Sequence, residues 1–172
     1  MLRAIGSKIK IEPDGEILSA QLHEIIGNLL GTDLVKKLDE YEQHCGTSRL
    51  QHCVNVAYYS YCISKVFHLD YRSSARGALL HDLFFYNWKE SGISCRAHVS
   101  NHPQVALENA ERVTTINKIE RDIIAKHMWP LTLVPPRYAE SYVVSFADKF
   151  CTVMEVFSRS AKHMALVRRL DN

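Results

Sequence analysis

A His–Asp pair stands at the end of an apolar run near the middle of this chain, where His81 and Asp82 follow Ala78–Leu80. Further residues of the types that bind metals lie on either side of the pair: His52, His102, His127 and Asp148. Imidazole and carboxylate together suit hard and borderline divalent cations. Because the six groups are spread over residues 52–148, several helices must bring them together. We predict a metal site here, and a metal site open to water predicts a hydrolase.

Asp148 is the most informative of these residues, because it follows the strongly apolar run Val143–Ala147. A buried aspartate needs a cation or several hydrogen-bond donors. The alternative is an ordinary salt bridge to Lys149 or Arg49. Four histidines lack such a context and are interpreted as ordinary surface or core residues: His23, His44, His68 and His163.

Helical periodicity dominates the sequence and predicts helices at 16–30, from 33 towards His44, and at 49–67, 72–83, 102–113, 118–126, 137–158 and 161–170. The stretch Asn87–Asn101 lacks clear periodicity and predicts a loop over the site. His102-Pro103 would then start a helix with proline in its first turn. Alternation typical of a strand occurs only at Lys8–Ile11. We predict one all-α domain, residues 1–172, of about seven or eight helices.

The composition, with 47% hydrophobic and 23% charged residues, is that of a globular protein. A net charge of +2 gives no reason to expect a nucleic acid or an anionic membrane as a partner. No apolar run approaches the ~20 residues of a transmembrane helix. The first thirteen residues lack the apolar region of a signal peptide. A homodimer is compatible with these features.

The five cysteines include no C-x-x-C pair, and their number is odd. This usage indicates reduced thiols and predicts a cytoplasmic protein. Cys62 and Cys151 stand in apolar helical stretches and are predicted to be small core residues. Cys45 and Cys53 flank His52, and an approach of either to the metal is the less favoured alternative.

The segments around these candidate ligands resemble those of a known family. Three segments match the H…HD…D pattern of the HD superfamily of metal-dependent phosphohydrolases: Arg49-Leu-Gln-His52, Gly77-Ala-Leu-Leu-His81-Asp82 and Phe146-Ala-Asp148-Lys149. The match covers about residues 45–158 and implies the helical bundle of an HD domain. His102 and His127 resemble the two added histidines of a two-metal branch, which includes HD-GYP phosphodiesterases and diadenosine tetraphosphate hydrolases.

The resemblance implies a role for each matching residue. His52, His81, Asp82 and Asp148 would hold a first ion, and Asp82 would bridge to a second ion held by His102 and His127. One or two divalent ions are expected, with iron or manganese favoured and zinc, nickel, cobalt or magnesium as alternatives. The segment after the His–Asp pair, Leu83–Trp88, lacks the Gly-Lys of HD-GYP proteins, which argues against cyclic di-GMP. It resembles instead a small bacterial HD subgroup.

The expected function is hydrolysis of a small phosphorylated substrate, a nucleotide or dinucleotide being favoured, by metal-activated attack of water on phosphorus. Either a phosphomonoesterase or a phosphodiesterase would fit. Two rivals stay open. The first is a non-catalytic HD domain that senses a nucleotide or binds a partner, and the second is a diiron oxygenase.

Asp82, Arg49 and Lys149 are the predicted catalytic residues. Arg49 lies one helical turn before His52 and is a candidate phosphate clamp, since guanidinium matches phosphate in a bidentate way. An exposed arginine at a helix start is the equally weighted alternative. Lys149 would bind the phosphate or cover a carboxylate near the site, and His98 is a candidate lid residue or general acid. The aromatic residues Trp88, Trp129 and Phe84–Tyr86 are interpreted as core or loop anchors.

Overall fold

The computed structural model describes residues 17–44, 46–88 and 90–170. Within them the chain forms seven α-helices, a 3-10 helix and a short hairpin: α1 (Ile17–Leu30), α2 (Asp33–Lys36), η1 (Lys37–Glu40), β1 (Glu42–His44), β2 (Thr47–Ser48), α3 (Arg49–Val66), α4 (Tyr71–Leu80), α5 (Cys95–Val113), α6 (Lys118–Lys126) and α7 (Ala139–Leu170). The predicted all-α fold is confirmed. The alternating segment Lys8–Ile11 lies outside the described residues.

Polar side chains fix where four of the helices begin. Ser48 caps α3, Asp70 caps α4 and Ser94 caps α5, each by accepting a hydrogen bond from a backbone N–H of the first turn. Asn117 and Glu120 form a reciprocal capping box at the start of α6. Such caps satisfy N–H groups that have no partner within the helix, and each typically contributes about 1 kcal/mol.

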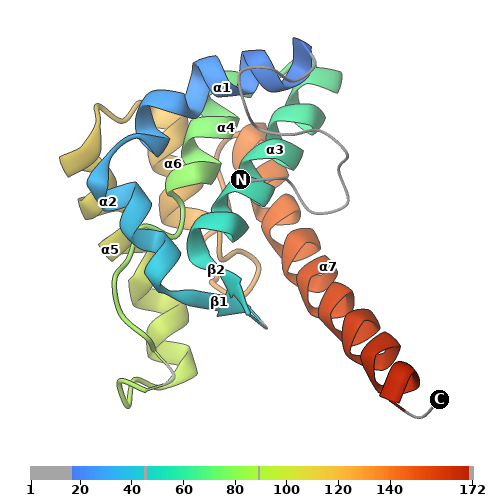
Figure 1. The fold of residues 1–172 in the computed structure, drawn as a ribbon. Coiled ribbons are helices and arrows are strands. Elements are labelled where there is room, and N and C mark those ends of the chain that lie inside the picture. Colours follow the sequence, from blue (N-terminus) through green and yellow to red (C-terminus); the bar gives the residue numbers. More distant parts are fainter. Residues whose placement is uncertain (1–16, 45, 89, 171–172) are drawn as a thin grey trace.

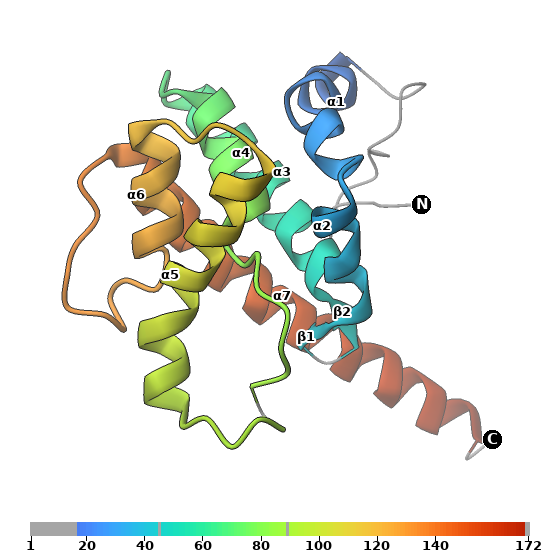
Figure 2. The same cartoon turned by 90° about the vertical axis from the view of Figure 1, so that its left-hand side faces the viewer.

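The helices α3 and α4 pack together in the middle of the bundle, and α7 packs against both (Figure 1). The helix α6 contacts α4 and α7 on the other side, and α5 contacts α6. Figures 1 and 2 both show the C-terminal half of α7 extending beyond the other elements. The packing brings the first turn of α3, the ends of α4 and α6 and the middle of α7 to one place.

A glycine allows α4 and α6 to approach closely. A Cβ atom at Gly77 would lie only 2.8 Å from Cδ1 of Ile123, so a larger residue would push the two helices apart. The approach matters because α4 and α6 end at His81 and His127, which are their C-cap residues.

Two predicted boundaries around the site are wrong. The helix α5 begins at Cys95, so the loop predicted over Asn87–Asn101 ends at Ser94 and Pro103 lies inside the helix rather than in its first turn. The cap by Ser94 starts the helix earlier. The helix therefore tolerates the loss of the one backbone hydrogen bond that Pro103 cannot donate. At the C-terminus, the predicted helices 137–158 and 161–170 are one helix, because no glycine or proline separates them.

The segment before α3 also differs from the prediction. The expected helix towards His44 stops after η1, and β1 pairs with β2 in antiparallel fashion. Gly46 has a φ of +79°, a conformation that glycine adopts without strain, and its N–H donates to Glu42 Oε1 at 2.7 Å. The hairpin matters for the site because it places Gln43 beside Asp82.

Candidate metal centre

The His–Asp pair lies where α4 stops. The His81 ring is fully buried and its Nδ1 contacts the carbonyl oxygen of Ala78 at 2.7 Å. Because a carbonyl oxygen only accepts, Nδ1 carries the hydrogen and the lone pair of the ring lies on Nε2. Asp82 follows in the turn and is also buried. The end of one helix therefore presents an imidazole nitrogen and a carboxylate side by side.

His102 and His127 are held in the same way. Nδ1 of His102 donates to the carbonyl of His98 at 2.8 Å, and Nδ1 of His127 donates to the carbonyl of Ile124 at 2.9 Å. Both rings are buried, and their Nε2 atoms lie 2.8 Å apart. With the hydrogens on Nδ1, two lone pairs face each other, an arrangement that a shared cation stabilises.

The fourth imidazole has a carboxylate behind it instead of a carbonyl. Nδ1 of His52, in the first turn of α3, lies 3.0 Å from Oε2 of Glu155 on α7. Asn55 donates to the other oxygen of Glu155 at 2.7 Å. A carboxylate behind a ligating histidine fixes its tautomer and makes its free nitrogen a better ligand.

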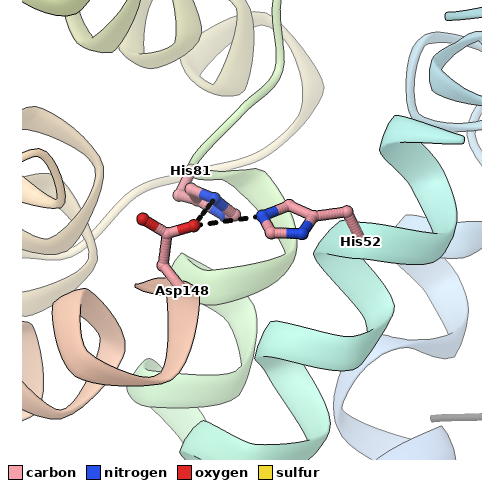
Figure 3. A group of neighbouring side chains, drawn as sticks. All are labelled: His52, His81 and Asp148. Atoms are coloured by element: carbon pink, nitrogen blue, oxygen red, sulfur yellow. Dashed lines mark hydrogen bonds and ion pairs between the residues drawn. The ribbon is translucent and has the colours of Figure 1, made fainter. Parts of the chain in front are cut away.

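Two overlapping groups of side chains could hold a cation. The first, here called the His52 group, comprises His52, His81 and Asp148, and Figure 3 shows the three side chains pointing toward one another from α3, α4 and α7. Oδ1 of Asp148 lies 3.1 Å from Nε2 of His52 and 3.7 Å from Nε2 of His81. The ligand atoms of the group all lie within 4.8 Å of one another.

The second, called the Asp82 group, comprises His81, Asp82 and His127, with His102 beside it. Oδ1 of Asp82 lies 3.5 Å from Nε2 of His127 and 3.3 Å from Nε2 of His102. Oδ2 of Asp82 lies 3.6 Å from Nε2 of His81. The two groups share His81, so all six residues predicted as ligands meet in one cluster. Their role as ligands stays a prediction.

Unpaired atoms in this cluster support the fit to a cation. Nε2 of His81 and Oδ1 of Asp82 are buried and have no hydrogen-bond partner among the described residues. Buried polar atoms without partners are costly and therefore rare in folded proteins. A lone pair and a carboxylate oxygen left open in one cluster are the donor set of a divalent cation.

The charges of the cluster point the same way. Burial would raise the pKa of Asp148, but the neighbouring His52 and His81 hold that pKa well below its usual value, so the carboxyl is ionised. Burial would lower the pKa of His52, but Asp148 and Glu155 outweigh it and raise that pKa to about 10. The negative charge that favours a proton there also attracts a cation, which displaces the proton on binding. In contrast, burial and the charges of His81 and His102 lower the pKa of His127 to about 3.

A cavity of about 350 Å³ opens onto the cluster. The cluster residues that line it are Asp82, His102, His127 and Asp148. Trp88 and His98 form another wall, with their rings stacked at 5.0 Å, and His98 in turn stacks on His102 at 4.5 Å. Burial and the nearby His102 lower the pKa of His98 to about 4, which leaves it neutral at pH 7 and favours the lid interpretation over the general acid.

Arg49 is not the exposed arginine of the alternative interpretation, since only 1% of its surface is accessible. Its Nη1 donates to the carbonyl of Phe84 at 2.6 Å, and its Nε donates to Oε1 of Gln43 at 2.7 Å. Gln43 then donates to Oδ2 of Asp82 at 2.5 Å. Arg49 is not among the described residues that line the cavity. These contacts favour a positioning role for Arg49, in which it ties the hairpin to the His–Asp loop.

Lys149 lies at the cavity wall, with about a third of its side chain exposed. Its Nζ donates to the carbonyl of His127 at 2.9 Å and to the carbonyl of Ser145 at 3.1 Å, and lies 3.6 Å from Oδ2 of Asp148. The position leaves the ammonium group beside the cluster and at the wall of the cavity.

Sequence reasoning missed the residues behind the ligands. Glu155 follows Asp148 by seven residues, which places both on one face of α7, and it also stands in an apolar stretch. The argument applied to the buried carboxylate of Asp148 therefore applies equally to Glu155. Gln43 had no such signal, because a polar residue on a hairpin is ordinary.

The remaining predicted residues have varied surroundings. Cys45 lies outside the described residues, Cys151 is buried as predicted, and Cys62 is half-buried. Cys53 is buried beside His81 and contributes to raising the pKa of that histidine, but it belongs to neither group. Phe84 lies in the core.

A comparison of this chain with protein-family models, characterised proteins and solved structures finds no match. Among the described helices, none is long and apolar enough to span a membrane. The argument for function therefore rests on the chemistry of the cluster and its cavity.

Proposed function

We propose that this chain is a metal-dependent phosphohydrolase of the HD type that cleaves a small phosphorylated molecule, with a nucleotide or dinucleotide as the favoured class. The observation that supports this most strongly is the convergence of four Nε2 atoms and two carboxylates beside one cavity. The resemblance of the motifs around His52, His81-Asp82 and Asp148 to the HD superfamily points to the same chemistry.

The two groups would hold two divalent cations, one at the His52 group and the other at the Asp82 group with His102 beside it, so that His81 would adjoin both cations. Iron or manganese suits these nitrogen and oxygen ligands, since no thiolate is among them. Such cations lower the pKa of water and polarise phosphoryl oxygens. Two carboxylates opposite two dications leave a net positive charge, which favours an anionic substrate over a neutral one.

The residues around the cluster add selectivity. The ammonium group of Lys149 at the cavity wall would bind a phosphate oxygen, and a charge-assisted hydrogen bond of this kind contributes roughly 1.5–3 kcal/mol. The cavity volume, about 350 Å³, falls at the lower end of the range for small-molecule sites. The indole of Trp88 gives one wall an apolar surface on which part of the substrate would rest.

The test combines elemental analysis with a screen of phosphate esters and anhydrides. Protein purified without chelator should carry at least one equivalent of metal and hydrolyse at least one substrate. Asp82→Ala removes the carboxylate of the Asp82 group, which lines the cavity, so turnover should fall by about a thousandfold or more, a loss of about 4 kcal/mol or more. Asp33→Ala, at an exposed position on α2, is the matched control and should keep full activity.

Other outcomes would favour the rivals. Metal-loaded protein that binds nucleotides without turnover would favour the sensing domain, and iron-dependent consumption of O₂ without phosphate release would favour the oxygenase. Equal turnover by the wild type and Asp82→Ala would assign the activity to a contaminant. A protein that takes up no divalent metal would contradict the proposal as a whole.

A further inference from the structure

The outward face of α7 is apolar. Its exposed large side chains include Tyr142, Phe146, Phe150, Val153 and Phe157, here called the outer stripe of α7. Phe146 is 63% exposed, Val153 51% and Phe157 68%. At 100° per residue these five positions fall within an arc of about 80°, so they form one continuous row along the helix.

The opposite face of the same helix is buried, so α7 is apolar on both sides. Between Ala139 and Phe157, all of which the structure describes, the charged residues Glu140, Asp148 and Glu155 are buried, and only Lys149 reaches the surface. A helix that faces water normally carries a polar side. The outer stripe is therefore an apolar surface without the polar side chains that a solvent-facing helix normally carries.

We propose that a second copy of this chain covers the outer stripe, so that the protein is a homodimer joined through α7. A two-fold interface needs a patch that is complementary to itself, and a row of uncharged side chains meets its own copy without repulsion. The helix has 32 residues and extends beyond the bundle in both views, so a second α7 can lie along it (Figures 1 and 2).

The area of the stripe matches this occupant. The exposed fractions of its five side chains correspond to roughly 500 Å² of apolar surface. A stable interface covers about 800 Å² of each partner, of which somewhat less than two-thirds is apolar. The stripe therefore supplies the apolar centre of one standard interface. Val153 also lines the cavity at the metal centre, beside Lys149, so a second copy would adjoin the route into the site.

The test is the mass of the full chain in solution, measured by light scattering at about 50 µM, where an interface of this size should be occupied. The wild type should have twice the monomer mass. Phe146→Glu and Phe157→Glu should each raise the dissociation constant about a hundredfold or more, because a two-fold interface buries each new charge twice. Circular dichroism would verify that both variants keep their helices.

Phe67→Glu is the matched control. Phe67 is the C-cap of α3 and is 67% exposed, almost the same as Phe157, but it lies on another element. This variant should remain a dimer. A monomeric wild type would overturn the proposal. A dimer that survives both α7 substitutions would overturn it as well. Neither result depends on whether the chain hydrolyses phosphates.

Discussion

The two halves of the metal cluster are supported in different ways. In the His52 group, His52 has the carboxylate of Glu155 behind it, and the pKa of His52 rises to about 10. In the Asp82 group, the rings of His102 and His127 have only backbone carbonyls behind them, and the pKa of His127 falls to about 3. The His52 group therefore has two carboxylates around it, those of Asp148 and Glu155, whereas the Asp82 group has the carboxylate of Asp82.

The halves also differ in their access to solvent. Asp82, His102 and His127 line the cavity. Of the His52 group, Asp148 is the one member among the described residues that line it. We infer that the His52 group would hold its cation more tightly and that the Asp82 group would hold its cation where substrate arrives. An enclosed site with two carboxylates beside an open site with one is a reasonable division between anchoring a metal and exposing one to chemistry.

The largest effect should follow from changing His81, which belongs to both groups. His81→Ala should reduce the metal content of the purified protein from its wild-type value to nearly none, because each site loses a ligand. His52→Ala and His127→Ala should each remove one ion at most. Elemental analysis measures all three, and the exposed His68, changed to Asn because its φ is positive, is the control. A His81→Ala protein that keeps its full metal content would show that the cluster is not the metal site.

Arg49→Ala should have the next largest effect, on stability. Removing the buried guanidinium leaves Gln43 and the carbonyl of Phe84 without their donors, at a cost of about 3 kcal/mol or more. For a chain of this length, that cost lowers the melting temperature by about 6–12 °C. Arg72→Ala, which breaks an exposed ion pair with Glu24, is the control and should leave the melting temperature close to that of the wild type.

The Arg49→Ala variant also shows whether Arg49 positions the Asp82 group or binds the substrate. Because Gln43 donates to Asp82, loss of Arg49 should weaken metal binding at the Asp82 group and leave the His52 group intact. An unchanged melting temperature and metal content, together with a kcat/KM lowered about tenfold or more, would restore Arg49 as a phosphate ligand.

Glu155→Gln should weaken only the His52 group. The change keeps the size of the side chain but removes the negative charge behind His52, and the loss of such a partner typically lowers metal affinity by about 10–100-fold. Competition against a chelator of known affinity would measure it. Glu24→Gln, at an exposed position, should leave affinity unchanged. If Glu155→Gln weakens both ions equally, the two halves do not differ in the way inferred here.

The sequence predicted the helices because their apolar positions recur with helical spacing and their starts carry caps. It failed where two local signals competed. Pro103 is typical of a first turn, but Ser94 caps the helix two turns earlier, so that Pro103 lies inside it. The hairpin around Gly46 was missed because strands of two or three residues are too short to show alternation.

The residues of the cluster were predictable because their types are chemically special and their neighbours are apolar. The residues that contact these ligands from behind were harder to predict, because a glutamine or an arginine gains such a role only when distant segments meet. Arg49 contacts the carbonyl of Phe84 and Gln43 contacts Asp82 across the fold, and no spacing along the chain encodes those two contacts. Glu155 is the exception. It follows Asp148 by seven residues, so its position on the same buried face of α7 could be inferred from the sequence.

The smallest effect should come from Lys149, which touches both halves without belonging to either. Lys149→Ala should lower kcat/KM about tenfold, close to 1.4 kcal/mol, with metal content unchanged, because a substrate phosphate would lose one charge-assisted hydrogen bond. Lys149→Arg should recover part of the activity. Lys118→Ala, at a separate cavity lined by Arg121 and Arg137, is the control and should have no effect. Since Nζ of Lys149 also donates to the carbonyl of His127, a purely structural role would instead reduce metal content at the Asp82 group. Metal analysis alongside the kinetics therefore decides whether this lysine serves the substrate or the site.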